Sequence, residues 1–270
     1  MLPIGRKPLI QYAVEEAAAS GLETAILVVP KDDHRVGDYF RADAKLEEQL
    51  RKQGRTSGLS HLNELSSLIK VTTVIQDTPR GLAHAIGCAR DAVGDEPFAV
   101  ILPDALIDPG CTCIRQLMEC YQQHFGCIVA TRQVELHEVA RFGILDVTPL
   151  PGSALSGRLF QVNSLVERPD PARASSRYGI FGRYIFEPLI FDCIDHTPPG
   201  RSGELQITDS LLLFSRRGPV YAYCFEGGHY DAGDQFGLWQ AGIDYSLRDP
   251  ELGERLREYL ADVILKAVPS

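Results

Sequence analysis

Two aspartates follow apolar, strand-like runs at the points where the strands should end. Asp104 follows such a run in "FAVILPDALID", and Asp231 follows another in "HYDAGDQFG". Carboxylates at the carboxyl ends of strands suit Mg²⁺, which takes one or two protein oxygens together with phosphates and water. A single aspartate of this kind is more often a turn cap, but the second instance favours a metal site. We expect Asp234, three residues further on, to cap the next helix.

A third strand end carries an amide instead of a carboxylate. In "IQDTPRGLAHAIG", Gln76 ends the apolar run and Gly81 lies in the turn before a helix. The amide offers a donor and an acceptor, which suits the edge of a nucleobase, and glycine lets the backbone approach a flat ring. The alternative is a plain strand-to-helix connection. We expect His84, on that helix, to be packed and not catalytic.

A charged pair closes a fourth run, in "SLVERPD", where Glu167 and Arg168 precede Pro169. One interpretation is a solvated ion pair. The other is that Glu167 accepts hydrogen bonds from sugar hydroxyls while Arg168 binds a phosphate through its planar fork of donors.

The elements that must position these residues alternate through the first half of the chain. The spacing of apolar residues predicts a helix from Pro8, then strands and helices in turn, over residues 24–29, 68–76, 81–93, 98–104, 114–124 and 127–134. Such alternation predicts a mostly parallel sheet. Residues 32–66 interrupt the pattern as a charged excursion.

The second half of the chain has a different order of predicted strands and helices. Three strand-like runs in succession indicate antiparallel additions that could cover a ligand, over residues 141–147, 159–169 and 178–186. Helices are expected at 204–217 and 234–246 around a strand at 219–228, and an amphipathic helix within 250–270. With no repeat or linker, a single domain over residues 1–270 is expected.

Composition narrows the class of partner. The 270 residues are 44% hydrophobic and carry a net charge of −9, which argues against a nucleic acid polymer or an anionic membrane as partner. A small anionic ligand remains compatible with local cations. The seven cysteines include no C-x-x-C pair, so neither a disulfide framework nor a zinc site is indicated, and most are expected in the core. With no signal peptide or membrane span in the sequence, we expect a cytoplasmic protein.

Taken together, these stretches resemble the bacterial UTP:glucose-1-phosphate uridylyltransferases, the UDP-glucose pyrophosphorylases of the sugar nucleotidyltransferase class. The segments that carry the resemblance run along nearly the whole chain: "MLPIGRKPLIQYAVEEA", "GLAHAIGCA", "VILPDALID", "FGILDV", "VERP", "GRYIF", "TPPGRSGELQITDS" and "YDAGDQFG". The resemblance implies an α/β, Rossmann-like nucleotidyltransferase fold, with a mixed, mostly parallel sheet flanked by helices. It also implies formation of UDP-glucose and pyrophosphate from UTP and glucose 1-phosphate, with Mg²⁺ as cofactor.

The same resemblance assigns roles to individual residues. Gln76 and Gly81 would contact uracil, Asp104 and Asp231 would bind Mg²⁺, and Gly143 and Glu167 would contact glucose. Arg168 would take the position of a phosphate-binding lysine. Asp104, Arg168 and Asp231 are therefore the expected catalytic residues.

The chain also departs from the family pattern. Members begin with a strand and a glycine-rich, arginine-bearing loop, and Met1 matches an internal methionine that follows them. We therefore expect a sheet without its first strand, and impaired turnover, because that loop would cradle the triphosphate. Arg80 and Ala83 stand where lysine and glycine are usual, and an arginine fork at position 168 is bulkier than an ammonium.

Two other functions remain open on the sequence. One is a non-catalytic, sugar-nucleotide-binding or regulatory paralogue, since binding residues alone do not require turnover. The other is a thymidylyltransferase, which the "VERP" and "GELQITD" segments disfavour. For either the enzyme or the paralogue we expect a homo-oligomer.

Overall fold

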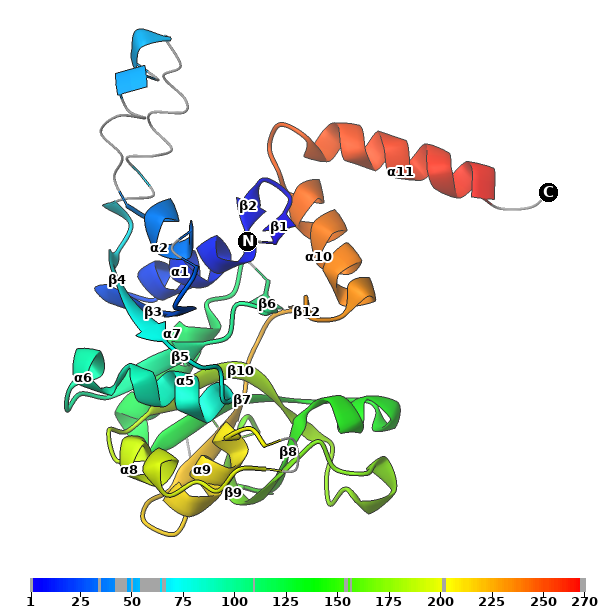
Figure 1. Cartoon of the computed structure of the whole chain (residues 1–270). Helices are drawn as coiled ribbons and strands as arrows, with labels where there is room; N and C mark the ends of the chain where they lie inside the picture. The colour runs from blue at the N-terminus through cyan, green and yellow to red at the C-terminus, as the bar shows by residue number, and fades with distance from the viewer. Residues whose placement is uncertain are drawn as a thin grey trace.

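The computed structural model describes residues 2–33, 35–41, 48–49, 51–53, 64, 67–108, 110–152, 155, 157–200 and 203–267. The elements in chain order (Figure 1) are β1 (Pro3–Ile4), β2 (Lys7–Pro8), α1 (Leu9–Ala19), β3 (Thr24–Pro30), α2 (Arg35–Tyr39), β4 (Lys70–Gln76), α5 (Leu82–Cys88), α6 (Arg90–Val93), β5 (Phe98–Ile101), β6 (Ala105–Ile107), α7 (Cys113–Gln123), β7 (Cys127–Gln133), η1 (Leu136–Arg141), β8 (Gly143–Pro149), β9 (Leu159–Glu167), η2 (Pro171–Arg173), β10 (Tyr178–Phe186), α8 (Ile190–Asp195), α9 (Ile207–Phe214), β11 (Val220–Cys224), β12 (His229–Asp231), α10 (Gln235–Leu247) and α11 (Gly253–Ala267). Most of the excursion expected at 32–66 lies outside the described residues.

Six strands form the central sheet, in the order β5-β10-β7-β11-β9-β8. Strands β5, β7 and β11 run in one direction, as the alternation of strands and helices predicts. The prediction of a mostly parallel sheet is wrong, because β10 enters antiparallel between β5 and β7. In the described part of the chain, parallel pairing is confined to β7–β11 and to β3–β4. The β3–β4 pair forms a two-stranded sheet of its own.

Helices cover both faces of the central sheet. Apolar side chains of α5, α8 and α9 pack on one face, among them Ala83, Phe191 and Leu211, while α7 packs on the other through Leu117 and Cys120. Four of the seven cysteines are buried, as expected: Cys113, Cys120, Cys127 and Cys193. The helix expected over 81–93 is divided at Ala89 into α5 and α6.

A small antiparallel pair, β6–β12, stands beside the central sheet and was not predicted. Apolar residues of α10 and β1 pack around it, including Leu106, Ala232 and Tyr245. Beyond α10, the C-terminal helix α11 extends away from the rest of the molecule (Figure 1). No helix among the described residues combines the length and the apolar character needed to cross a membrane.

Candidate active site

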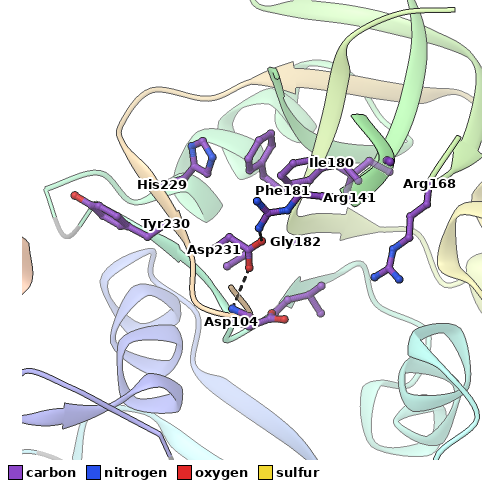
Figure 2. Close-up of a pocket in the computed structure, with 14 residues that line it drawn as sticks. Asp104, Arg141, Arg168, Ile180, Phe181, Gly182, His229, Tyr230 and Asp231 are labelled. Carbon is purple, nitrogen blue, oxygen red and sulfur yellow. Dashed lines mark hydrogen bonds and ion pairs between the residues drawn. The ribbon is translucent and has the colours of Figure 1, made fainter. Parts of the chain in front are cut away.

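A cavity of about 470 Å³ opens where β6 and β12 meet the middle of β10. Figure 2 shows its lining, which consists of Leu102, Asp104, Ala105, Ala140, Arg141, Phe142, Arg168, Ile180, Phe181, Gly182, His229, Tyr230, Asp231 and Gly233. Three of the residues singled out from the sequence, Asp104, Arg168 and Asp231, are therefore gathered at one cavity. The lining combines two carboxylates with two guanidinium groups.

The β6–β12 pairing brings Asp104 and Asp231 together. Asp231 lies opposite Ala105, and the backbone N–H of Ala232 donates to the Asp104 carbonyl at 2.8 Å. A Cβ placed on Gly233 would lie 3.1 Å from Asp231 Oδ1 and 3.9 Å from Asp104 Oδ2, so both carboxylates face the same small volume. Glycine at position 233 keeps that volume open.

Arg141, at the end of η1, is a cavity residue that the sequence reasoning missed. Its Nη2 lies 2.7 Å from Asp231 Oδ2 and 3.3 Å from Asp234 Oδ2. Partial burial opposes its charge, but the two carboxylates outweigh that effect and raise the pKa of Arg141. The only sequence signal for it is a basic residue two positions before Gly143.

Asp234 does not act as the expected cap. It occupies the residue before α10, but its side chain makes no capping hydrogen bond there. The carboxylate turns to Arg141 instead. An ion pair with a guanidinium competes effectively with a backbone N–H for a carboxylate.

Gly143 and Glu167 lie opposite each other in the β8–β9 pair, next to the cavity residues Phe142 and Arg168. Glu167 Oε2 accepts a hydrogen bond from Thr208 Oγ1 at 3.1 Å. A Cβ on Gly143 would lie 2.8 Å from Thr208 Cγ2 and 3.1 Å from Glu167 Oε2. Glycine is therefore required here by close packing within the protein.

Arg168 turns at the end of β9 in a left-handed backbone conformation, with φ of +43°. Its Nε lies 3.6 Å from Glu167 Oε1, and its side chain is 70% exposed. An exposed ion pair at this distance is weak, so the guanidinium is free to bind a ligand in the cavity.

Gln76 and Gly81 lie outside the cavity lining, at the end of β4 and just before α5. The side chains of Gln76 and Arg80 both contact the His84 ring, with Gln76 Nε2 2.6 Å from Nδ1 and Arg80 Nη2 2.8 Å from Nε2. We expected His84 to be a packed residue. It is half-buried, but both of its ring nitrogens also contact polar side chains. Burial and the neighbouring Arg80 lower the pKa of His84.

The backbone around Gly81 is fixed by a crossing segment. Leu205 N donates to Arg80 O at 2.7 Å, and Ala83 N donates to Leu205 O at 3.1 Å. Gly81 has φ of +100°, and a Cβ there would lie 2.6 Å from Leu205 O. The structure thus gives a reason for this glycine that the sequence did not suggest, namely the close approach of the Glu204–Leu205 backbone.

His229 adds a neutral ring to the cavity wall. Its centroid lies 4.2 Å from that of Phe181, in an edge-to-face contact. Burial, reinforced by the nearby Arg132, lowers the pKa of His229 to about 4. The ring is therefore uncharged at neutral pH.

A buried ion pair supports the strand end that leads to Asp104. Arg183 is 2% exposed, and its Nε and Nη2 donate to Glu16 Oε2 at 3.0 and 2.9 Å. Its Nη1 donates to the carbonyl of Leu102 at 2.9 Å, two residues before Asp104. The other Glu16 oxygen accepts from the N–H of Ile114 at the start of α7. Arg183 and Glu16 thereby join α1, α7 and β10 at the base of the cavity.

The two carboxylates that converge at the cavity, Asp104 and Asp231, are the oxygen donors we consider for a cation. Among the described residues no group of three or more histidine, cysteine, aspartate or glutamate side chains is placed to hold a metal ion. Two converging carboxylates open to a cavity fit Mg²⁺, which completes its shell with phosphate oxygens and water, better than Zn²⁺, which prefers nitrogen and sulfur.

Comparisons with known proteins find relatives that match over most of the chain. The chain is 37% identical over 264 residues to UTP–glucose-1-phosphate uridylyltransferase YngB of Bacillus subtilis (strain 168), covering 98% of this chain and 87% of the relative. A crystal structure of UDP-glucose pyrophosphorylase complexed with UDP-glucose superposes with a TM-score of 0.78 at 34% identity, covering 91% of this chain and 89% of that one. UTP-bound UGPase from Acinetobacter baumannii superposes with a TM-score of 0.87 at 29% identity, covering 97% and 90% of the two chains.

The predicted Rossmann-like nucleotidyltransferase fold is confirmed by these superpositions. The model of the nucleotidyl transferase family matches residues 1–246, which include every residue of the cavity and of the Gln76–His84 turn. Two relatives from Bacillus subtilis (strain 168), each 37% identical to this chain, are UTP–glucose-1-phosphate uridylyltransferases. The chain belongs to the nucleotidyl transferase family.

Proposed function

We propose that this protein transfers a uridylyl group from UTP to glucose 1-phosphate, forming UDP-glucose and releasing pyrophosphate. The observation that carries the proposal is the convergence of Asp104 and Asp231 on one cavity edge, with Arg141 and Arg168 in the same wall. Two carboxylates and two guanidinium groups around an open cavity suit a reaction between phosphate groups. The names of the relatives support the choice of substrates.

The reaction needs no covalent enzyme intermediate. A phosphate oxygen of glucose 1-phosphate attacks the α-phosphorus of UTP in line, and the bond to the leaving pyrophosphate breaks. The protein contributes positioning and charge neutralisation. Arg168 would hold the sugar phosphate, and Glu167, supported by Thr208, would accept hydrogen bonds from sugar hydroxyls while Gly143 keeps the adjacent strand close.

Asp104 and Asp231 would hold Mg²⁺. When bound, Mg²⁺ neutralises phosphate charge and orients the phosphates. Arg141 supplies positive charge at Asp231, where it would compete with a cation, and its guanidinium would bind the phosphates.

Gln76 and Gly81 would bind the uracil base at the turn between β4 and α5. The Gln76 amide is held by His84, and the backbone beyond Gly81 is held by Leu205, so the contact surface is formed before the ligand arrives. We also propose a cytoplasmic, homo-oligomeric enzyme. Seven thiols without a disulfide support a reducing compartment.

Pyrophosphate release from UTP and glucose 1-phosphate, followed with and without Mg²⁺, tests the proposal directly. We expect turnover that a chelator abolishes and that Asp104→Asn lowers strongly. UDP-glucose binding without any pyrophosphate release would indicate a non-catalytic paralogue instead. Faster turnover with dTTP than with UTP would indicate a thymidylyltransferase.

A further inference from the structure

The imidazole of His84 lies between two side chains that can both donate hydrogen bonds. Gln76 Nε2 is 2.6 Å from His84 Nδ1, and Arg80 Nη2 is 2.8 Å from His84 Nε2. A neutral imidazole accepts at only one of its two nitrogens, so it cannot accept from both neighbours at once. One of the two contacts must therefore run in the other direction.

The ring is neutral in the folded protein. Burial and the adjacent guanidinium of Arg80 both lower the pKa of His84. A protonated ring would also point an N–H at Arg80, which has no acceptor to offer. The His84 ring therefore carries a single N–H hydrogen, either on Nδ1 or on Nε2.

The donors on the Nε2 side decide where that hydrogen lies. Arg80 can only donate, so Nε2 must be the acceptor. The thiol of Cys88 lies 4.0 Å from the same nitrogen, and burial raises its pKa, so it also keeps its hydrogen. The ring hydrogen is consequently on Nδ1, which donates to the Gln76 side chain.

An acceptor on Gln76 must then face Nδ1. A half turn of the side-chain amide exchanges its oxygen and nitrogen at nearly unchanged positions, and the hydrogen-bond network determines which orientation is present. The partner of Nδ1–H is accordingly the Gln76 oxygen. The NH₂ group occupies the other end of the amide.

We propose that His84 is a positioning residue that fixes the Gln76 amide with its NH₂ group toward the ligand, so that Gln76 selects a base by a carbonyl oxygen. Uracil offers such an oxygen on both sides of its N3–H. The inference rests on the proposed contact between Gln76 and the base, and it specifies which hydrogen bond that contact contains.

The surroundings of Gln76 favour a fixed orientation. The residue is only 9% exposed, and within the described part of the chain its amide has no partner other than His84. Its second polar atom is not sealed from solvent, which leaves that end available. Arg80 is held at its backbone by Leu205, so the donor that orients the ring is itself positioned.

Nuclear magnetic resonance of the full chain labelled with ¹⁵N-histidine tests the tautomer without any ligand. Long-range ¹H–¹⁵N correlations distinguish a protonated Nδ1 from a protonated Nε2, and His84→Gln identifies the signals by their loss. We expect hydrogen on Nδ1 and none on Nε2. Hydrogen on Nε2 would overturn the inference.

The Gln76→Glu variant tests the outward-facing donor, because it keeps the shape of the side chain. Its inner oxygen can still accept from Nδ1–H, but its outer end has no hydrogen to donate. We expect UTP affinity, measured by calorimetry, to fall at least about tenfold. Affinity close to that of the original chain would mean that an oxygen already faced the ligand, and the inference would fail.

Arg80 provides a matched pair of variants. Arg80→Lys retains a donor to Nε2 and should preserve the Nδ1–H tautomer, whereas Arg80→Met removes it and should give a mixture of tautomers with UTP affinity reduced about three- to tenfold. An unmixed tautomer in Arg80→Met would contradict the role given to Arg80. Absence of UTP binding by the original chain would contradict the proposed function, while UTP binding with an Nε2–H ring contradicts this inference alone.

Discussion

Charged side chains face one another at the cavity, whereas at the turn before α5 a neutral imidazole and backbone groups hold the residues expected to contact the base. At the cavity, the Asp231 and Arg141 side chains are each more than one-third exposed and form a direct ion pair at 2.7 Å. At the turn before α5, Gln76 is buried against His84 and the backbone is fixed by Leu205. The cavity end can therefore rearrange when charges arrive, whereas the turn is formed in advance.

This difference matches what each end would recognise. A triphosphate brings several negative charges, and flexible ion pairs can exchange partners at low energetic cost. A base is a flat, nearly neutral ring whose identity depends on the direction of a few hydrogen bonds, so the groups that read it must be fixed beforehand. Variants that remove a charge at the cavity, or that disturb the backbone at the turn, test whether the two regions differ in this way.

The largest expected effect is on turnover, from Asp231→Asn. Removing one of two converging carboxylates should lower kcat by roughly 10³-fold, because charge neutralisation is the main catalytic contribution. The free energy of unfolding should change by less than about 1 kcal/mol, since the Asp231 side chain is 38% exposed, solvent weakens its ion pair with Arg141, and an asparagine oxygen can still accept from Gly233 N–H.

Asp234→Asn is the matched control, since Asp234 contacts the same Arg141 but is not among the residues that line the cavity. Pyrophosphate release and urea unfolding should be measured on both variants. Equal losses of kcat in the two variants would contradict the assignment of Asp231.

At the turn before α5, the expected effect of a substitution is on stability. Gly81→Ala places a methyl group 2.6 Å from Leu205 O in a backbone conformation that only glycine adopts readily, so we expect a loss of about 3–5 kcal/mol. Gly94 has φ of +71° but no atom within 4 Å of its added Cβ. Gly94→Ala should therefore cost only the backbone strain, about 1–3 kcal/mol.

Urea unfolding of the two glycine variants, side by side, measures the difference. If the Gly81→Ala protein is no less stable than the Gly94→Ala protein, then the turn accommodates the added methyl group at little energetic cost. In that case it would not be formed in advance of ligand binding.

The cavity end should also make stability depend on pH through His229. The unfolded chain binds a proton near pH 6.5, but the folded protein binds it only near pH 4, because burial and Arg132 lower the pKa of His229. Between these values the unfolded state holds more protons, so the free energy of unfolding should fall by about 1–3 kcal/mol as the pH drops from about 6.5 to 4.

Urea unfolding across this pH range, compared between the original chain and His229→Gln, isolates the contribution. The slope should become shallower in the variant, and the remainder includes His84, whose pKa is lowered as well. Identical slopes would show that His229 does not contribute to the pH dependence of the free energy of unfolding.

The smallest expected effect concerns Arg141→Gln. Freeing Asp231 from its guanidinium should raise the affinity for Mg²⁺ alone about fivefold, since a half-exposed ion pair contributes about 1 kcal/mol, and should lower the affinity for UTP. Arg158→Gln is a matched control, because Arg158 is equally exposed and pairs with Glu226 outside the cavity.

Calorimetry with Mg²⁺ and with UTP distinguishes the two variants. If both affinities of Arg141→Gln equal those of Arg158→Gln, then the guanidinium of Arg141 does not compete with the cation.

The parts of this site that the sequence predicts are those governed by local pattern. Asp104 and Asp231 were found because each follows a recognisable apolar run, and β5, β7 and β11 have the predicted common direction. The insertion of β10 between β5 and β7 is a pairing between strands that lie far apart in the sequence. No spacing in the sequence records that pairing.

Contacts between side chains distant in sequence were also beyond prediction. Arg141 meets Asp231 across 90 positions, and the reason for glycine at position 81 is a backbone segment more than a hundred residues away. The His84 contacts are local, since Arg80 lies four residues before it, just outside the start of α5. They were missed because a histidine near a helix start is usually a packing residue.

The β6–β12 pairing also fixes when the two carboxylates first meet as the chain folds. It joins a segment from the first half of the chain to one near its end, and such distant pairings form late because closing a long loop is entropically costly. The β8–β9 hairpin can form from neighbouring residues long before. A partly folded chain can thus hold the β8–β9 hairpin and still have Asp104 and Asp231 far apart. Cation binding by this pair of carboxylates would consequently report that folding is complete, and a chain arrested earlier would not sequester the ion.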